Sequence, residues 1–154
     1  MVPDLPENCN CSALRQAARH ISRMYDEALA PVGLGTNQYS ILSRLERFGP
    51  LAQNELAERL VMDRSTLGHL LGPLERRGLL GIAVDPDDRR RKLLALSTIG
   101  QELLDEARPS WSAAQARFEG QFGAAEAERL RTTLMQVTNV PLRADAGGPD
   151  GGEK

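Results

Sequence analysis

Apolar residues recur with helical spacing in two neighbouring stretches near the middle of the chain. The first stretch places Leu56, Ala57 and Leu60 on one face. The second repeats leucine at i, i+3, i+4 and i+7, which is the spacing of one buried helix face. Its members are Leu67, Leu70, Leu71 and Leu74. The pattern therefore predicts two helices separated by a tight turn at residues 61–62.

Local signals mark both ends of the second predicted helix. Asp63 is suited to the N-cap position, because its carboxylate can accept hydrogen bonds from the free N–H groups of Ser65 or Thr66. Gly78 stands where a C-terminal glycine cap belongs. Pro73 lies between them, and an interior proline removes one helical hydrogen bond. We therefore expect a helix that begins at Asp63, bends near Pro73 and ends at Gly78.

Beyond Gly78 the periodicity changes from helical to alternating. Apolar side chains occupy alternate positions within residues 79–84 and again within residues 93–96. Between these stretches, Pro86 among aspartates is typical of a turn. The pattern predicts a hairpin of two short strands, and its loop carries four consecutive cations from Arg89 to Lys92.

Helical periodicity also covers the chain on both sides of this central segment. Ser12, Thr36 and Ser97 each precede an apolar-periodic stretch and are suited to begin a helix. Pro109 within the third stretch predicts a kink, and the glycines at residues 120–123 predict a break. The expected helices cover residues 12–29, 36–48, 98 to about 120, and 124 to about 140.

The order helix, turn, helix, strand, charged hairpin, strand is that of a winged helix-turn-helix. The predicted fold is mainly α with a small β-hairpin wing. The expected divisions are a flexible arm at 1–11, a single domain at 12–140 and a disordered tail at 141–154. Within that domain the winged helix covers 36–97, and the dimerisation helices cover 12–32 and 98–140.

The outer helices carry an apolar face that one core near the winged helix cannot bury completely. Two arrangements would cover it: a two-fold partner whose outer helices interdigitate, or a self-contained bundle within one chain. We favour the homodimer, because two recognition helices at a fixed separation suit two half-sites of DNA.

Short and hydrogen-bonding side chains occupy the face of the second central helix that lies opposite its leucines. Such side chains suit base edges and phosphates. A run of charges alone is more often a solvated loop, but an arginine on a hairpin beside a helix-turn-helix suits the narrow minor groove. Asp88 is expected to pair with an arginine and hold the loop. The candidate DNA contacts are Arg64, Ser65, Thr66, His69, Arg76, Asp88, Arg89, Arg90 and Arg91.

Composition restricts the binding partners and the location that the sequence allows. The 154 residues carry a net charge of −2, which argues against a non-specific nucleic-acid binder. Residues 53–92 carry eight Lys or Arg and seven Asp or Glu, so the expected DNA-facing part is mildly basic. No apolar run reaches the roughly 18 residues of a membrane span, and the acidic, proline-broken N-terminus does not resemble a signal peptide. We therefore expect a cytoplasmic protein that does not bind a membrane.

No group of residues has the spacing of a catalytic or metal site. Neither His20 nor His69 stands at a triad-like spacing from a cysteine, serine or carboxylate. Cys9, Cys11 and His20 do not supply four metal ligands, and no glycine loop suits a phosphate. The sequence thus predicts a protein that is not an enzyme and that holds no cofactor or metal.

The hairpin from Asp85 to Ser97, DPDDRRRKLLALS, resembles the wing signature of the MarR family of bacterial regulators. The segments 63–66 and 74–79 resemble the recognition helix of that family, and the likeness covers roughly residues 11–140. The resemblance implies a triangular homodimer on a palindromic operator. It also implies, for many members, a repressor released by small phenolic ligands or by oxidation of a cysteine.

The signal that such a regulator would sense has several candidates. A thiol at a helix N-terminus tends toward the reactive thiolate, and Cys11 directly precedes the predicted helix start. Cys11 followed by Tyr25 resembles the hydroperoxide-sensing branch of the family, the OhrR type, in which two tyrosines hydrogen-bond to the sensing cysteine. Thr36 stands at the second tyrosine position here. Three alternatives stay open: oxidation at Cys11, a small phenolic or aromatic ligand near Tyr25, Tyr39 and Trp111, or no effector.

These observations predict a sequence-specific double-stranded DNA-binding transcriptional regulator, expected to act as a repressor and a homodimer on a palindromic operator. The alternative is a winged-helix protein-interaction module without DNA binding, which would need an acidic or apolar recognition face. A thiol oxidoreductase would need a redox cysteine pair on an active-site scaffold, and the pattern does not supply one.

Overall fold

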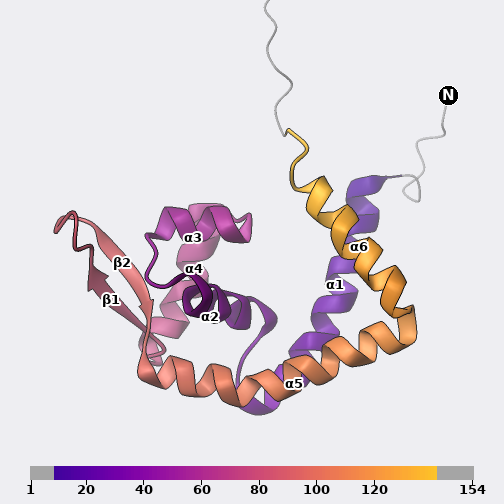
Figure 1. The fold of residues 1–154 in the computed structure, drawn as a ribbon, viewed down its shortest axis with the longest axis horizontal. Coiled ribbons are helices and arrows are strands. Elements are labelled where there is room, and N and C mark those ends of the chain that lie inside the picture. Colours follow the sequence, from indigo (N-terminus) through magenta and orange to yellow (C-terminus); the bar gives the residue numbers. More distant parts are fainter. Residues whose placement is uncertain (1–8, 142–154) are drawn as a thin grey trace, which may run out of the picture. The chain divides into compact units, whose positions relative to one another are not determined.

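The computed structural model describes residues 9–141, and the expectations for residues 1–8 and 142–154 lie outside this range. The described residues form two compact units, which divide between Arg117 and Phe118. The first holds α1 (Asn10–Leu29), the 3-10 helix η2 (Ala30–Val32), α2 (Thr36–Phe48), α3 (Gln53–Leu60), α4 (Arg64–Arg76), β1 (Leu80–Val84) and β2 (Lys92–Leu96) (Figure 1). Helix α5 (Thr98–Phe122) crosses the boundary, and α6 (Ala124–Val137) belongs to the second unit. The mainly helical fold with one β-hairpin is confirmed, whereas a single domain over 12–140 stays a prediction.

The core of the first unit is built largely from leucines of α2, α3 and α4. The predicted stripe of α4 faces this core, with Leu67, Leu71 and Leu74 buried and Leu70 packed against them. Each fully buried leucine contributes about 1.5–3 kcal/mol relative to an exposed one. The core therefore holds α4 by one face and leaves the opposite face exposed. The largest fully buried side chains among the described residues are Leu29, Ile41, Leu42, Leu45, Leu56, Leu67, Leu74 and Leu104.

Both predicted ends of α4 are confirmed. Asp63 is the N-cap, since its Oδ1 accepts the N–H of Thr66 at 2.8 Å and its Oδ2 accepts the Thr66 hydroxyl at 2.6 Å. At the other end Gly78 has a φ of +70°, a left-handed conformation that glycine adopts without steric cost. Pro73 lies inside α4, and the helix continues past it to Arg76.

Two other helix starts differ from the sequence prediction. Helix α1 begins at Asn10, and its N-cap is Cys9, whose Sγ accepts the N–H of Ser12 at 3.5 Å. Ser12 therefore lies inside the helix, and Cys11 belongs to its first turn and not to an arm that precedes it.

Helix α2 begins at Thr36 itself, and its N-cap is Gly35, whose N–H donates to Oε1 of Gln38 at 3.1 Å. The hydroxyl of Thr36 does not cap α2. It donates to Oδ1 of Asp26 at 2.6 Å, and the Thr36 N–H donates to the same oxygen at 2.7 Å. Thr36 thus ties the start of α2 to α1.

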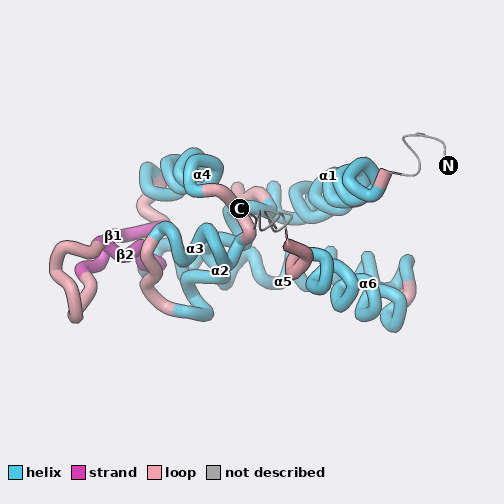
Figure 2. Tube along the Cα trace, turned by 90° about the horizontal axis from the view of Figure 1, so that it is seen from above, coloured by secondary structure: helices cyan, strands magenta, loops and turns pink. Residues whose placement is uncertain are grey.

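The two strands pair antiparallel, with Leu80 opposite Leu96 and Val84 opposite Lys92. The hairpin projects away from α2, α3 and α4, as Figure 2 shows, so that no layer covers its outer part. The alternation that predicted the strands therefore marks a buried side chain only at Leu80 in β1 and at Leu94 in β2. Leu80 is 7% exposed, whereas Ile82 is 57% exposed.

Ser97 caps the start of α5, as predicted. Its Oγ accepts the N–H of Gly100 at 2.9 Å and donates to the carbonyl oxygen of Gly78 at 2.6 Å, which joins the end of α4 to the start of α5. Gly100 lies so close to Leu79 that a Cβ added there would collide with the Leu79 carbonyl oxygen. Pro109 lies inside α5, which is one helix throughout.

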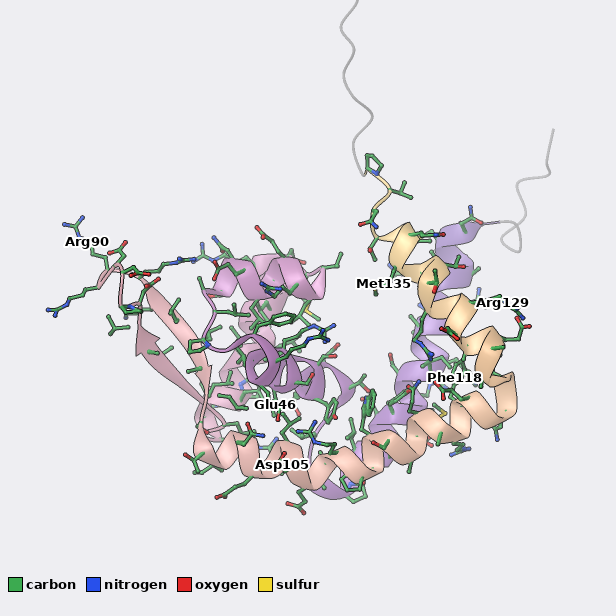
Figure 3. The ribbon with its side chains drawn as sticks, in the orientation of Figure 1. Glu46, Arg90, Asp105, Phe118, Arg129 and Met135 are labelled. Atoms are coloured by element: carbon green, nitrogen blue, oxygen red, sulfur yellow. The ribbon has the colours of Figure 1, made fainter. Side chains whose placement is uncertain are left out.

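The second unit contains the end of α5 and α6. Gly123, with a φ of +99°, separates the two helices at the predicted break. The rings of Phe118 and Phe122 stack with centroids 5.2 Å apart, and Arg131 pairs with Glu119 at 2.8 Å. The large apolar side chains exposed on α6 in the single chain are Leu130, Leu134, Met135 and Val137, of which Figure 3 labels Met135. Within residues 9–141, no helix has the length and apolar content needed to cross a membrane.

Candidate nucleic-acid interface

The polar face of α4 is exposed along its length. Arg64, Ser65, His69 and Arg76 are all exposed, opposite the buried leucines. No side-chain hydrogen bond or ion pair engages these four residues within the described part of the chain. Their side chains are therefore available to a partner, as the sequence predicted.

Thr66 is also exposed, but its hydroxyl hydrogen is already committed to Asp63. The hydrogen bonds from the Thr66 hydroxyl and N–H lower the pKa of Asp63, so this cap is charged at neutral pH. Thr66 can still accept a hydrogen bond from a base or phosphate through its hydroxyl oxygen.

The turn between α3 and α4 is held by backbone hydrogen bonds. The N–H of Val61 donates to the carbonyl of Glu58 at 3.1 Å, and the N–H of Met62 donates to that of Ala57 at 2.9 Å. Val61 has a φ of +53°, a left-handed conformation that is costly for a β-branched side chain. The sequence predicted the turn but gave no signal for this conformation.

The wing loop is shaped by its own aspartates. Oδ1 of Asp85 accepts the N–H of Asp87 at 2.9 Å, and Oδ1 of Asp88 accepts the N–H of Arg90 at 3.0 Å. Asp88 was expected to pair with an arginine side chain, but it holds the loop through this backbone N–H instead. Arg89 and Arg90 are exposed and have no side-chain partner among residues 9–141. Figure 3 shows Arg90 at the hairpin tip, extending away from the helices.

Arg91 is engaged differently from the two arginines before it. Its Nη2 lies 2.8 Å from Oε1 of Glu55 in α3, and its Nη1 lies 3.4 Å from Oδ2 of Asp85. The N–H of Ala52 and then Arg91 lower the pKa of Glu55, and Glu55 raises the pKa of Arg91. The run of four cations did not reveal this difference, because Glu55 lies far from the hairpin in sequence.

The candidate effector residues fall into two places. Trp111 stacks on Tyr39 with ring centroids 5.7 Å apart and is tilted against Tyr25 at 6.3 Å, while the Tyr25 hydroxyl hydrogen-bonds to Gln115. Cys11 stands fourteen residues before Tyr25 on the same helix, which is about 21 Å along the axis. Within one chain, therefore, the three aromatic residues meet and Cys11 does not join them.

The helices that carry the aromatic cluster also carry a group of ion pairs and a hollow. Arg108 of α5 bridges Glu46 of α2 at 2.7 Å and Asp105 at 3.0 Å, and both acids are labelled in Figure 3. Burial raises the pKa of the Tyr39 hydroxyl, and the nearby charge of Arg108 opposes that rise.

A hollow of about 370 Å³ lies between α1 and α5, lined by Met24, Glu27, Ala28, Ser110, Ala113, Ala114 and Arg117. Within the described residues, no group of three or more His, Cys, Asp or Glu could hold a metal ion.

Solved structures with this fold include complexes with DNA. The transcriptional regulator MosR of M. tuberculosis in complex with DNA is 32% identical, with 86% of this chain and 97% of that chain covered and a TM-score of 0.73. The transcriptional repressor CouR bound to a 23-mer DNA duplex is 26% identical, with 86% and 94% covered and a TM-score of 0.77. CouR from Rhodococcus jostii RHA1 bound to p-coumaroyl-CoA is similar at 26% identity, with 92% and 99% covered and a TM-score of 0.75.

Comparison of sequences also finds transcriptional regulators. The transcriptional activatory protein BadR of Rhodopseudomonas palustris is 26% identical over 138 residues, which cover 87% of this chain and 79% of BadR. A sequence model described as MarR family matches residues 32–91, from the end of η2 into the wing loop. With the shared winged-helix fold, these similarities show that the chain belongs to the MarR family of transcriptional regulators.

Proposed function

We propose that the protein binds double-stranded DNA with sequence specificity, as a homodimer on a palindromic operator, and represses transcription until a small ligand or thiol oxidation releases it. The observation that carries DNA binding is the exposed polar face of α4 beside a hairpin that bears Arg89 and Arg90. In a helix-turn-helix such a helix enters the major groove and its polar side chains contact base edges. Exposed arginines on a wing suit the minor groove, where the potential is most negative.

The dimer proposal is supported by apolar side chains that remain exposed in each unit of the single chain. On α6 these include Leu134 at 36% and Met135 at 64%, and on α1 Leu14 is 38% exposed. Exposed apolar side chains gathered on one element, as on α6, are typical of an interface between proteins. A closed two-fold dimer would cover it and fix two copies of α4 for two half-sites.

The release proposal has two sites within this chain. A small aromatic ligand would bind near Tyr25, Tyr39 and Trp111, where α1, α2 and α5 meet. An oxidant would act on Cys11, which is exposed in the first turn of α1 and lies beside the capping Cys9. DNA titrations with and without an organic hydroperoxide, on the parent and on Cys11→Ser, separate the two. Equal loss of binding in both proteins, or no loss in either, would remove Cys11 as the sensor.

Selection of bound sequences from a random DNA library with the full-length protein tests the central proposal. We expect enrichment of a two-fold symmetric site whose half-sites lie about one helical turn apart, or a multiple of it. Transcription from a promoter that contains this site should fall when the protein is added. A rise would make the protein an activator, as the name of BadR describes that protein. No enrichment would favour the protein-interaction module instead.

A further inference from the structure

Packing fixes the wing only at its base. Leu80 and Leu94 are buried there, and Leu94 exchanges two backbone hydrogen bonds with Leu51, of 3.0 and 2.8 Å. Along β1, Ile82 pairs with Leu94 and is already 57% exposed, and Val84, nearer the tip, is 60% exposed. Because these apolar side chains bury little surface, hydrophobic packing does not fix the position of the hairpin tip.

A polar connection takes the place of packing in the outer part of the wing. Arg91 bonds to Glu55 at 2.8 Å and approaches Asp85 at 3.4 Å, and the Asp85 residue is only 8% exposed. Glu55 is itself held, because its second oxygen accepts the N–H of Ala52 at 3.0 Å in the first turn of α3. One guanidinium thus joins the start of α3 to the base of the wing loop.

Backbone hydrogen bonds link Arg91 to the tip of the wing. The N–H of Asp85 donates to the carbonyl of Arg91 at 3.1 Å, and the N–H of Arg91 donates to the carbonyl of Asp88 at 2.9 Å. The next residue back, Arg90, donates its N–H to the Asp88 carboxylate at 3.0 Å. The position of Arg91 therefore constrains the loop from which Arg89 and Arg90 project.

We propose that Arg91 is a positioning residue and not a DNA contact. Together with Glu55 and Asp85 it forms a wing clamp, which holds the hairpin against α3 and so sets where Arg89 and Arg90 lie relative to α4. This assignment departs from the sequence prediction, in which Arg91 was a candidate DNA contact together with Arg89 and Arg90. It rests on the proposed function, since the clamp matters for binding only if the wing binds DNA.

The direction in which one substitution changes DNA affinity distinguishes the clamp from simple electrostatics. Glu55→Gln removes a negative charge beside the wing, so electrostatics alone predicts tighter DNA binding. Glutamine still caps α3 at this position, because its side-chain oxygen can accept the Ala52 N–H. The clamp predicts weaker binding, by about two- to fivefold for each wing and so by roughly four- to twenty-five-fold for a dimer. Glu58→Gln, an exposed acid on the same helix with no contact to the wing, is the matched control.

Two combined variants test positioning itself. Arg91→Gln should weaken binding as much as Glu55→Gln, and the double variant should be no weaker than either one, because both remove the same contact. In a background that carries both Arg89→Ala and Arg90→Ala, Glu55→Gln should have little further effect, since both displaced cations are already absent. A Glu55→Gln protein that binds as tightly as the parent, or more tightly, would overturn the proposal.

Amide hydrogen exchange tests the clamp without DNA. Amides of residues 83–93 should exchange several-fold faster in Glu55→Gln than in the parent and in Glu58→Gln, because opening of the outer hairpin becomes easier. If the parent selects no DNA sequence but this exchange difference is seen, the clamp stands as structure and the proposed function fails. If exchange is unchanged, the clamp is refuted whatever the protein binds.

Discussion

At Gly100 the first turn of α5 lies directly against the carbonyl group of Leu79. A Cβ at this position would collide with that oxygen and lie 2.8 Å from Cδ1 of Leu96. We expect Gly100→Ala to lower the free energy of unfolding by about 3 kcal/mol, the upper range for forcing extra atoms into a packed site. Chemical denaturation measures the change. Gly120→Ala on the same helix is the control, since nothing lies within 4 Å of its added Cβ, and it should be neutral or gain up to about 1 kcal/mol.

The burial of Tyr39 predicts how the stability of the protein changes with pH. Burial raises its pKa, so the folded state favours the neutral phenol more than the unfolded state does. The resulting stability is fully present below the unfolded value of about 10 and is lost as pH rises through the higher folded value. Tyr39→Phe should therefore lose less stability than the parent in urea unfolding between about pH 9 and pH 11. Parallel loss in both proteins would contradict the raised pKa.

Sequence signals at single residues succeeded where the partner is close in the chain. Asp63 and Ser97 cap helices whose free N–H groups follow three residues later, so spacing alone identified them. The same signal failed at Thr36, because Asp26 of another helix takes its hydroxyl. The engagement of Arg91 was missed for the same reason, since its partner in α3 is 36 residues away.

At the scale of the element, α4 combines two kinds of exposed side chain. His69 lies on its polar face, and Arg76 lies in its last turn. We expect His69→Ala to change the preferred DNA sequence, because base contacts specify. Arg76→Ala should instead weaken binding to all sequences alike, because phosphate contacts carry no sequence information. Parallel selections with the two variants measure this difference, and an unchanged sequence preference for His69→Ala would reject its assignment. Thr66 is a poor test residue, because its loss would also weaken the cap of α4.

The hairpin shows what periodicity can and cannot predict about an element. Alternation located both strands to within a residue, because pairing and turn chemistry are local. It did not predict that Ile82 and Val84 are exposed, since burial depends on whether another layer covers the strand. In a projecting wing no such layer exists, and polar contacts such as Arg91 to Glu55 determine its position.

At the scale of the whole molecule, the prediction is a homodimer. Sedimentation at micromolar concentration should give about twice the 16.8 kDa chain mass. Leu134→Glu should give monomers or aggregates, because an unpaired charge is costly in an apolar interface. Ile82→Glu, which charges an exposed apolar position on the wing, should remain dimeric. A folded, monomeric parent would refute the dimer.

The central claim is that α4 and the wing together bind DNA, and equilibrium titration of the selected site tests it most directly. The parent is compared with Arg90→Ala and with Arg19→Ala, an exposed arginine on α1 that has no partner among the described residues. We predict that Arg90→Ala weakens binding by about 1–3 kcal/mol and lowers the salt dependence by about one unit for each wing. Arg19→Ala should bind like the parent. Unchanged affinity and salt dependence for both Arg89→Ala and Arg90→Ala would contradict the account.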